Sequence, residues 1–221
     1  NHSFYERPNI KKEIIQVGAG IPFGFESVTN SALGIGGAYG TWGESYDNVS
    51  LRELVSLRRG ETLKDEDVMN LSELGFLSRH HIPDLNDAEH LELELQVGAR
   101  MLQEASHANG WDPADVDAVL IGMSGPVSPD YVSSICERSG IPDKALKVSV
   151  HKACDGSVGS LNLALNPGLA RKGQMNIAEE LMGKKVLIGG IEGLSRFIRR
   201  ARDKYALQLF GNAAGIIGVV P

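Results

Sequence analysis

The sequence predicts an α/β protein built on a mixed, mostly parallel, five-stranded sheet. Short apolar runs rich in β-branched residues recur along the chain, and helix-like apolar patterns lie between them. Glycine-containing turns separate the two kinds of segment. Strands that alternate with helices at this rhythm form a sheet covered on both faces, whose reactive side chains gather at the carboxyl ends of the strands.

Length and composition are those of an ordinary globular protein. The chain has 221 residues, 42% of them hydrophobic, which is enough for one α/β domain over residues 1–221. A net charge of -6 and a pI near 5.5 argue against non-specific binding to nucleic acid or anionic membranes. No apolar run is long enough to span a bilayer. The basic cluster at 196–204 is either a solvated helix face or a contact for an acidic ligand or carrier protein.

The cysteine content favours the cytoplasm. Only Cys136 and Cys154 occur, too few for a disulfide framework. No secretory leader opens the sequence. The chain begins at Asn1 rather than at a methionine, however, so a trimmed targeting segment stays open as an alternative.

The first quarter of the chain predicts one strand and a long irregular passage. Residues 12–17 form the strand, and a turn-rich passage over 18–24 follows it. Gly18 and Gly20 suggest a dinucleotide site, but Pro22 stands where a helix should begin, which argues against one. Residues 31–47 have no period, so we expect a glycine-rich loop, either an inserted flap or a partner-binding surface.

Helices are expected at 51–59 and 63–74, so that the glycine-rich insertion and its helices cover about 31–74. In the segment 75–82, His80 and His81 point to opposite faces of a strand and have no ligand at metal spacing, so we expect no metal site. The strongest helix pattern covers 88–108, with an acidic first turn and a stop at Asn109-Gly110.

In the second half of the chain, predicted strands alternate regularly with predicted helices. Strands are expected at 116–121, 146–150, 184–190 and 216–220, and helices at 131–139 and from 157 onward. A polar link over 166–176 and a short helix ending at 182 precede the third of these strands. The five predicted strands contain, in order, Ile14, Val119, Val148, Leu187 and Ile217.

One stretch, LKVSVHKACDGSVGSLNLAL at 146–165, places Cys154 between a strand and a helix. Backbone N–H groups at a helix start favour a thiolate and stabilise a developing oxyanion, so Cys154 is a candidate nucleophile. The alternative is an inert, packed cysteine, since free cysteines are among the most buried residues. His151 is three residues earlier, which does not by itself give the geometry of a general base.

Several segments together resemble a known family. They are GFLSRHHI, VDAVLIGMSGP, GIPDKALKVSVHKACDGSVGSLNLAL, KKVLIGGIEGLSR and LFGNAAGIIGVVP, in this order. Beyond about Gly75, and in the first strand, the chain resembles the amino-terminal half of the β-ketoacyl-acyl carrier protein synthase III family of the thiolase-like superfamily. The resemblance implies one half of a pseudo-symmetric, layered thiolase-like fold.

The resemblance also implies an acyltransferase activity. Cys154 is similar to the family's nucleophile, which takes an acyl group from a thioester of coenzyme A or acyl carrier protein for a Claisen-type condensation in fatty acid or related biosynthesis. Its backbone N–H would join the oxyanion hole. Arg79 falls near the basic residues that meet the phosphopantetheine-bearing substrate, or is a surface arginine. Ser124 lies in the loop that lines the pocket, and Phe210 in a turn that shapes it. No bound cofactor is implied.

The sequence departs from the family in ways that limit this activity. The family completes its site with a histidine and an asparagine from a second half, and nothing follows Pro221 here. The family's cofactor-stacking tryptophan is absent near 70–72, and Asp155 stands beside the thiol, where a carboxylate disfavours a thiolate. We therefore expect a missing carboxy-terminal half or a partner subunit, and a homodimer. The alternative is a non-catalytic assembly or binding module.

Overall fold

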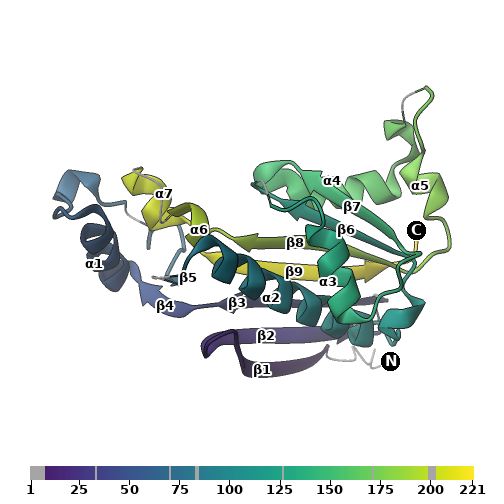
Figure 1. Cartoon of the computed structure of the whole chain (residues 1–221), viewed down its shortest axis with the longest axis horizontal. Coiled ribbons are helices and arrows are strands. Elements are labelled where there is room, and N and C mark those ends of the chain that lie inside the picture. The colour runs from purple at the N-terminus through teal and green to yellow at the C-terminus, as the bar shows by residue number, and fades with distance from the viewer. Residues whose placement is uncertain are drawn as a thin grey trace, which may run out of the picture.

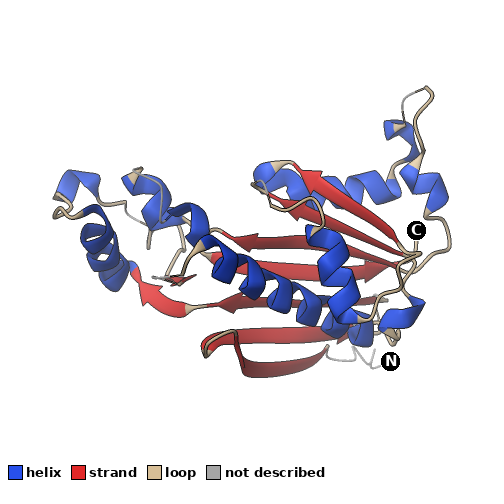
Figure 2. Ribbon diagram, in the orientation of Figure 1, coloured by secondary structure: helices blue, strands red, loops and turns tan. Residues whose placement is uncertain are grey.

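The fold is a single large sheet with helices on both faces (Figures 1 and 2). It was obtained as a computed structural model, which describes residues 8–32, 34–69, 71–82, 85–125, 127–170, 172–198 and 203–221. In spatial order the strands are β1 (Asn9–Val17), β2 (Ile21–Asn30), β3 (Ile35–Trp42), β9 (Asn212–Val219), β8 (Val186–Gly193), β6 (Ala118–Met123) and β7 (Leu146–His151). A second sheet pairs β4 (Glu44–Asp47) with β5 (Ser78–His81).

The helices are distributed along the whole chain. They are α1 (Asn48–Arg59), α2 (Asp87–Ala108), α3 (Tyr131–Ser139), α4 (Gly156–Leu165), α5 (Ile177–Glu180), α6 (Ser195–Ile198) and α7 (Lys204–Leu209). The predictions at 51–59, 88–108, 131–139 and from 157 onward are confirmed by α1, α2, α3 and α4. The basic cluster is described only in part, because residues 199–202 lie outside the described ranges.

The predicted layered α/β class with a mixed sheet is confirmed, but the sheet has seven strands rather than five and is mostly antiparallel rather than mostly parallel. The β6–β7 and β6–β8 ladders are parallel, whereas the other ladders are antiparallel. Short turns join β1, β2 and β3, and such turns allow only antiparallel neighbours. Helices α3 and α4 provide the longer connections that parallel neighbours need.

The prediction of a loop at 31–47 is wrong, because this segment contains β3, which lies inside the sheet between β2 and β9. Its glycines provide space instead of flexibility. A Cβ on Gly36 would lie 2.4 Å from the carbonyl oxygen of Ala108 in α2, and one on Gly37 would lie 2.6 Å from that of Ile216 in β9. Glycine in a strand commonly marks such a close backbone approach. β1, which the sequence predicts as a member of the central sheet, is an edge strand.

Two other local predictions fail. The turn-rich passage predicted for 18–24 is shorter, since β2 already begins at Ile21. The helix predicted at 63–74 is absent, and only a 3-10 turn at Asp65–Asp67 forms there. Gln208 of α7 explains this, because its side chain accepts from the Met69 N–H at 3.0 Å and donates to the Asp67 carbonyl at 2.9 Å. These tertiary hydrogen bonds satisfy backbone groups that a helix would otherwise pair.

The two faces of the sheet carry two separate cores. Val119 and Ile121 of β6 belong to the large cluster that includes α2 and α3, whereas Ala118 and Leu120 pack with α4 on the other face. This follows from the two-residue alternation of a strand. A capping box between Asn86 and Glu89 starts α2, the longest helix. In the part of the chain that is described, no helix combines the length and apolar character needed to cross a membrane.

Gly36→Ala tests the packing of β3 against α2. We expect it to lower the free energy of unfolding by about 2 kcal/mol, because the new Cβ would overlap the end of α2. Gly24→Ala is the matched control, since the nearest atom to its Cβ is 3.8 Å away on Ile14. Urea unfolding of both variants measures the difference, and equal stability of the two would contradict the close approach.

Candidate active site

The candidate residues gather at one edge of the sheet. The parallel strands β6, β7 and β8 end there, with Ser124 following β6 and Cys154 following β7. β9 is antiparallel, so its first residue, Asn212, pairs with Gly193 at the end of β8, and Phe210 lies two residues before it. A Cβ on Gly211 would lie 3.1 Å from the Cβ of Arg79, which brings β5 to the same edge.

Cys154 is exposed at the start of α4. It lies in the 3-10 turn Ala153–Asp155, which runs directly into the helix at Gly156. No side chain caps this helix start. The first N–H groups of a helix have no partner within the helix and carry partial positive charge. The thiol therefore stands where an anion is stabilised, and it is not the packed, inert cysteine of the alternative interpretation.

The backbone beside the thiol has an uncommon conformation. Ala153 has a φ of 49°, in the left-handed region that residues other than glycine rarely adopt. Such conformations cost energy and persist only where the surrounding structure holds them. The strained residue lies directly before the candidate nucleophile.

Three glycines bring the start of α4 onto the sheet. A Cβ on Gly122 of β6 would lie 2.2 Å from the carbonyl carbon of Gly156, and one on Gly190 of β8 would lie 2.4 Å from the Ser157 hydroxyl oxygen. Gly122 and Gly190 are neighbours across the ladder. The helix start can therefore lie directly on two strands, which fixes the position of the cysteine turn.

The charged neighbours of Cys154 balance one another. The Lys152 ammonium lies 2.5 Å from the Asp155 carboxylate, so the carboxylate that follows the thiol has a counter-charge. His151 is exposed at the end of β7, opposite Met123. Within the described ranges, no hydrogen bond joins Cys154 to a histidine.

Ser124 takes part in a polar contact at the end of β6. Its hydroxyl and its backbone N–H both donate to the Glu192 carboxylate on β8. Burial raises the pKa of Glu192, and these hydrogen bonds oppose the shift. Ser124 itself is exposed at the edge, as a residue that lines a pocket must be.

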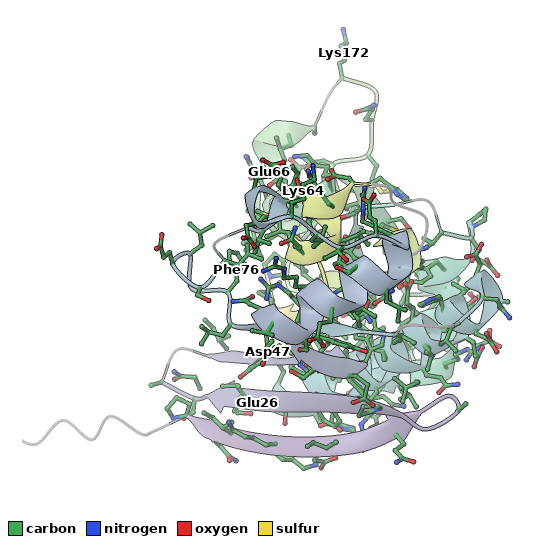
Figure 3. The ribbon with its side chains drawn as sticks, turned by 90° about the vertical axis from the view of Figure 1, so that its left-hand side faces the viewer. Glu26, Asp47, Lys64, Glu66, Phe76 and Lys172 are labelled. Carbon is green, nitrogen blue, oxygen red and sulfur yellow. The ribbon has the colours of Figure 1, made fainter. Side chains whose placement is uncertain are left out.

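Arg79 is buried, so the surface-arginine alternative is excluded. Its side chain is 5% exposed, and Nη1 donates to the Asn48 side-chain oxygen at 2.5 Å. The guanidinium lies over the Phe76 ring, 6.0 Å from the centroid, on the end of the molecule that Figure 3 shows. Phe210 is 36% exposed. Contact of either residue with substrate stays a prediction.

The histidine pair diverges as expected for neighbours on a strand. His81 is fully buried on the same side of β5 as Arg79, and burial lowers its pKa to about 4, so it is neutral at pH 7. His80 is partly buried, and its Nδ1 lies 3.1 Å from the Gly43 carbonyl oxygen.

Glu94 of α2 is a buried carboxylate that was not predicted from the sequence. This carboxylate is 1% exposed, and its Oε1 lies 3.0 Å from Nε of Arg196 in α6. Burial raises its pKa to about 7, against the opposing effect of Arg196. One signal was present in the sequence: Glu94 is four residues before Gly98 and seven before Met101, which both lie on the buried face of the helix.

The fold is similar to solved structures of type III polyketide synthases and of a 3-oxoacyl-(acyl-carrier-protein) synthase III. A fungal type III polyketide synthase gives a TM-score of 0.58 at 16% identity, over 79% of this chain and 52% of that one. Germicidin synthase from Streptomyces coelicolor, also a type III polyketide synthase, gives 0.58 at 17%, over 80% and 56%. A 3-oxoacyl-(acyl-carrier-protein) synthase III gives 0.51 at 21%, over 80% and 46%.

The chain therefore has the layered α/β fold of these structures, and it spans about half the length of the structures it matches. No protein-family profile matches the sequence, and no curated protein sequence does either. At these identities the likeness concerns the fold alone.

The two cysteines should differ in reactivity. Burial raises the pKa of Cys136 to about 11, and its side chain is fully buried, whereas Cys154 is exposed. We expect iodoacetamide to label Cys154 at least ~100-fold faster in the native protein, since thiolate content and access control the rate. Peptide mass spectrometry after timed labelling measures both rates. Comparable labelling of both would contradict this arrangement, and denatured protein provides the control in which both react.

Proposed function

We propose that this chain is the nucleophile-bearing half of a condensing acyltransferase of the β-ketoacyl synthase III type. The Cys154 thiolate attacks the carbonyl carbon of an acyl thioester carried on coenzyme A or acyl carrier protein. The tetrahedral intermediate expels the carrier thiolate, which takes up a proton, and the acyl group remains on Sγ. Backbone N–H groups at the start of α4 stabilise the oxyanion of this step.

The observation that carries the proposal is the position of Cys154, exposed at the uncapped start of α4 on the carboxyl edge of the sheet. The likeness of the fold to condensing enzymes supports it, as does the order of the sequence segments that resemble synthase III. One of the matching structures is described as CsyB complexed with CoA-SH, which supports coenzyme A thioesters as the substrate class.

Condensation of the acyl group with a second substrate needs the histidine and the asparagine that complete the site in the family that the sequence segments resemble. We propose that a carboxy-terminal half or a partner subunit contributes a histidine and an asparagine, since the chain spans about half of the matching structures. The same partner would enclose Cys154 and exclude water from the acyl-enzyme. The cytoplasm, with its supply of acyl thioesters, is the proposed compartment.

The surface that this partner covers lies on the α4 side of the sheet. α4 contains no charged residue, yet Val158 is 66% exposed and Leu165 is 49% exposed. Farther across the sheet, on β1, β2 and β3, a groove of about 420 Å³ passes between Ile14 and Tyr39, which are also exposed. Exposed apolar side chains on an uncharged helix commonly mark an interaction surface, so we propose that a second half, or a second copy in a homodimer, covers this face.

A non-catalytic assembly or binding module is the second candidate. The absence of a hydrogen bond between Cys154 and a histidine in the described ranges favours it. In this case Cys154 would bind no acyl group, and the same apolar face would serve only for association.

Acyl transfer to Cys154 tests the proposal directly. After incubation with acetyl- or octanoyl-coenzyme A, we expect intact-protein mass spectrometry to show one added acyl group with release of coenzyme A. Cys154→Ala should abolish the adduct, and Cys136→Ala should retain it, because Cys136 is buried away from the edge. An adduct that survives in Cys154→Ala, or no adduct with either chain length, would reject the nucleophile role.

A further inference from the structure

Four ionisable side chains, two of them buried and two partly buried, form a cluster where β8 ends. They are Glu94 from α2, Tyr131 from α3, Glu192 from β8 and Arg196 from α6. Figure 1 shows α6 beside the first turns of α2, at the end of β8. His90, one turn earlier on α2, is buried as well. This cluster has no part in the chemistry proposed for Cys154.

The Glu94 carboxylate is held in place by packing. A Cβ on Gly193 would lie 1.7 Å from its Oε1, so the carboxylate lies directly on the backbone at the end of β8. Among the described residues, Arg196 is the cation in contact with it, 3.0 Å away, and the Arg196 side chain is 15% exposed. The Tyr131 hydroxyl faces the same carboxylate, and its ring is 1% exposed. Glu94 is therefore sealed from water on every side that these elements cover.

The charges of the cluster do not balance when every group is ionised. Of the described groups that act on Glu94, Glu192 is a second carboxylate and Arg196 is the one cation, so these three groups together carry one net negative charge when all are ionised. An uncompensated buried charge is costly, and a proton removes that cost. Ser124 donates two hydrogen bonds to Glu192 and so favours its ionised form, which leaves Glu94 as the group that takes up the proton.

We propose that Glu94 is a proton switch: when protonated it leaves one carboxylate for one guanidinium, and when ionised it places a net negative charge between α2, α3, α6 and the end of β8. Burial raises the pKa of Glu94 to about 7, which is the direction expected if the protonated form gives the balanced charges. The switch therefore operates near neutral pH. Ionisation of Glu94 therefore destabilises the packing of α2, α3, α6 and the end of β8 against one another.

The switch is connected to the candidate active site through the residue that precedes Arg196. Ser195 is fully buried, its Oγ accepts from the Ile82 N–H at 3.2 Å, and its N–H donates to Asn212 Oδ1 at 3.0 Å. Asn212 in turn donates to the Trp42 carbonyl oxygen at 3.1 Å. These hydrogen bonds join the residue before Arg196 to β3, to β9 and to the residue after β5, at the edge where Cys154, Phe210 and Arg79 lie.

The pH dependence of stability tests the switch. Because the folded-state pKa of Glu94 lies above its usual 4.5, the folded protein binds this proton more tightly than the unfolded chain. Stability should fall as the pH rises from about 4.5 to about 7 and stay low above it. We expect the folding equilibrium constant of the wild type to drop at least ~10-fold more between pH 5.5 and 8.5 than that of Glu94→Gln, measured by urea unfolding.

Two further variants test whether the pH effect comes from this cluster. Glu192→Gln should reduce the drop in the folding equilibrium constant between pH 5.5 and 8.5, because Arg196 then balances the charge of Glu94 alone. Glu104→Gln, which removes an ion pair with Arg100 on the same helix, is the matched control and should leave the drop unchanged. If Glu94→Gln does not fold, infrared titration of the wild-type protein should show a buried protonated carboxyl that disappears near pH 7 and is retained in Glu104→Gln. Absence of that band, or an unchanged drop in Glu94→Gln, would overturn the switch.

The acyl-transfer experiment fails or succeeds independently of this switch. Loss of the adduct in Cys154→Ala does not depend on Glu94, and the stability measurements need no acyl substrate. A wild-type protein that shows the pH effect but forms no adduct would retain the switch and reject the nucleophile.

Discussion

The contact between Gly122 and Gly156 determines how the rest of the site is built. A strand and a helix start touch here through their backbones, because neither residue has a side chain. The neighbouring Gly190 makes room for Ser157 in the same way. With the first turn of α4 resting on β6 and β8, the turn that carries Cys154 is held at the carboxyl edge of the sheet. A methyl group at either glycine would lift the helix and with it the thiol.

The face of the sheet that carries α4 is only partly covered. Helices α2 and α3 pack on one face of the sheet, and on the other face α4 packs on β6, β7 and β8. α4 has no charge in GSVGSLNLAL, although Val158 and Leu165 are exposed. Exposed apolar side chains of this kind commonly mark an interaction surface. The partner proposed for this face would also enclose Cys154.

The ion pairs of this protein differ mainly in how far they are buried. Arg138 and Glu92 form a two-pronged pair at 2.7 and 2.8 Å in solvent, and Arg138 lowers the pKa of Glu92 to about 2. Glu94 also has an arginine at hydrogen-bond distance, yet its pKa moves in the opposite direction. Water solvates the first carboxylate in addition to its arginine, whereas packing withholds water from the second. The arginine thus favours the ionised carboxylate in both pairs, and for Glu94 the effect of burial outweighs it.

The sequence by itself determined those helices and strands whose patterns lie within a short stretch of the chain. Apolar spacing and capping residues predicted α1, α2, α3 and α4, and the strand-to-helix transition placed Cys154 at the start of α4. The tertiary structure alone decided that the glycine-rich segment at 31–47 contains β3. Its glycines allow close backbone contact with Ala108 and Ile216, which are far away in sequence. It also decided that 63–74 is not a helix, because Gln208 pairs with its backbone. Glu94 became visible only in the fold, since its pKa depends on burial and on Arg196 and Glu192, which lie about a hundred residues away along the chain. Hydrogen-bond and packing partners distant in sequence leave no periodic pattern, and that is the physical reason why these features could not be predicted.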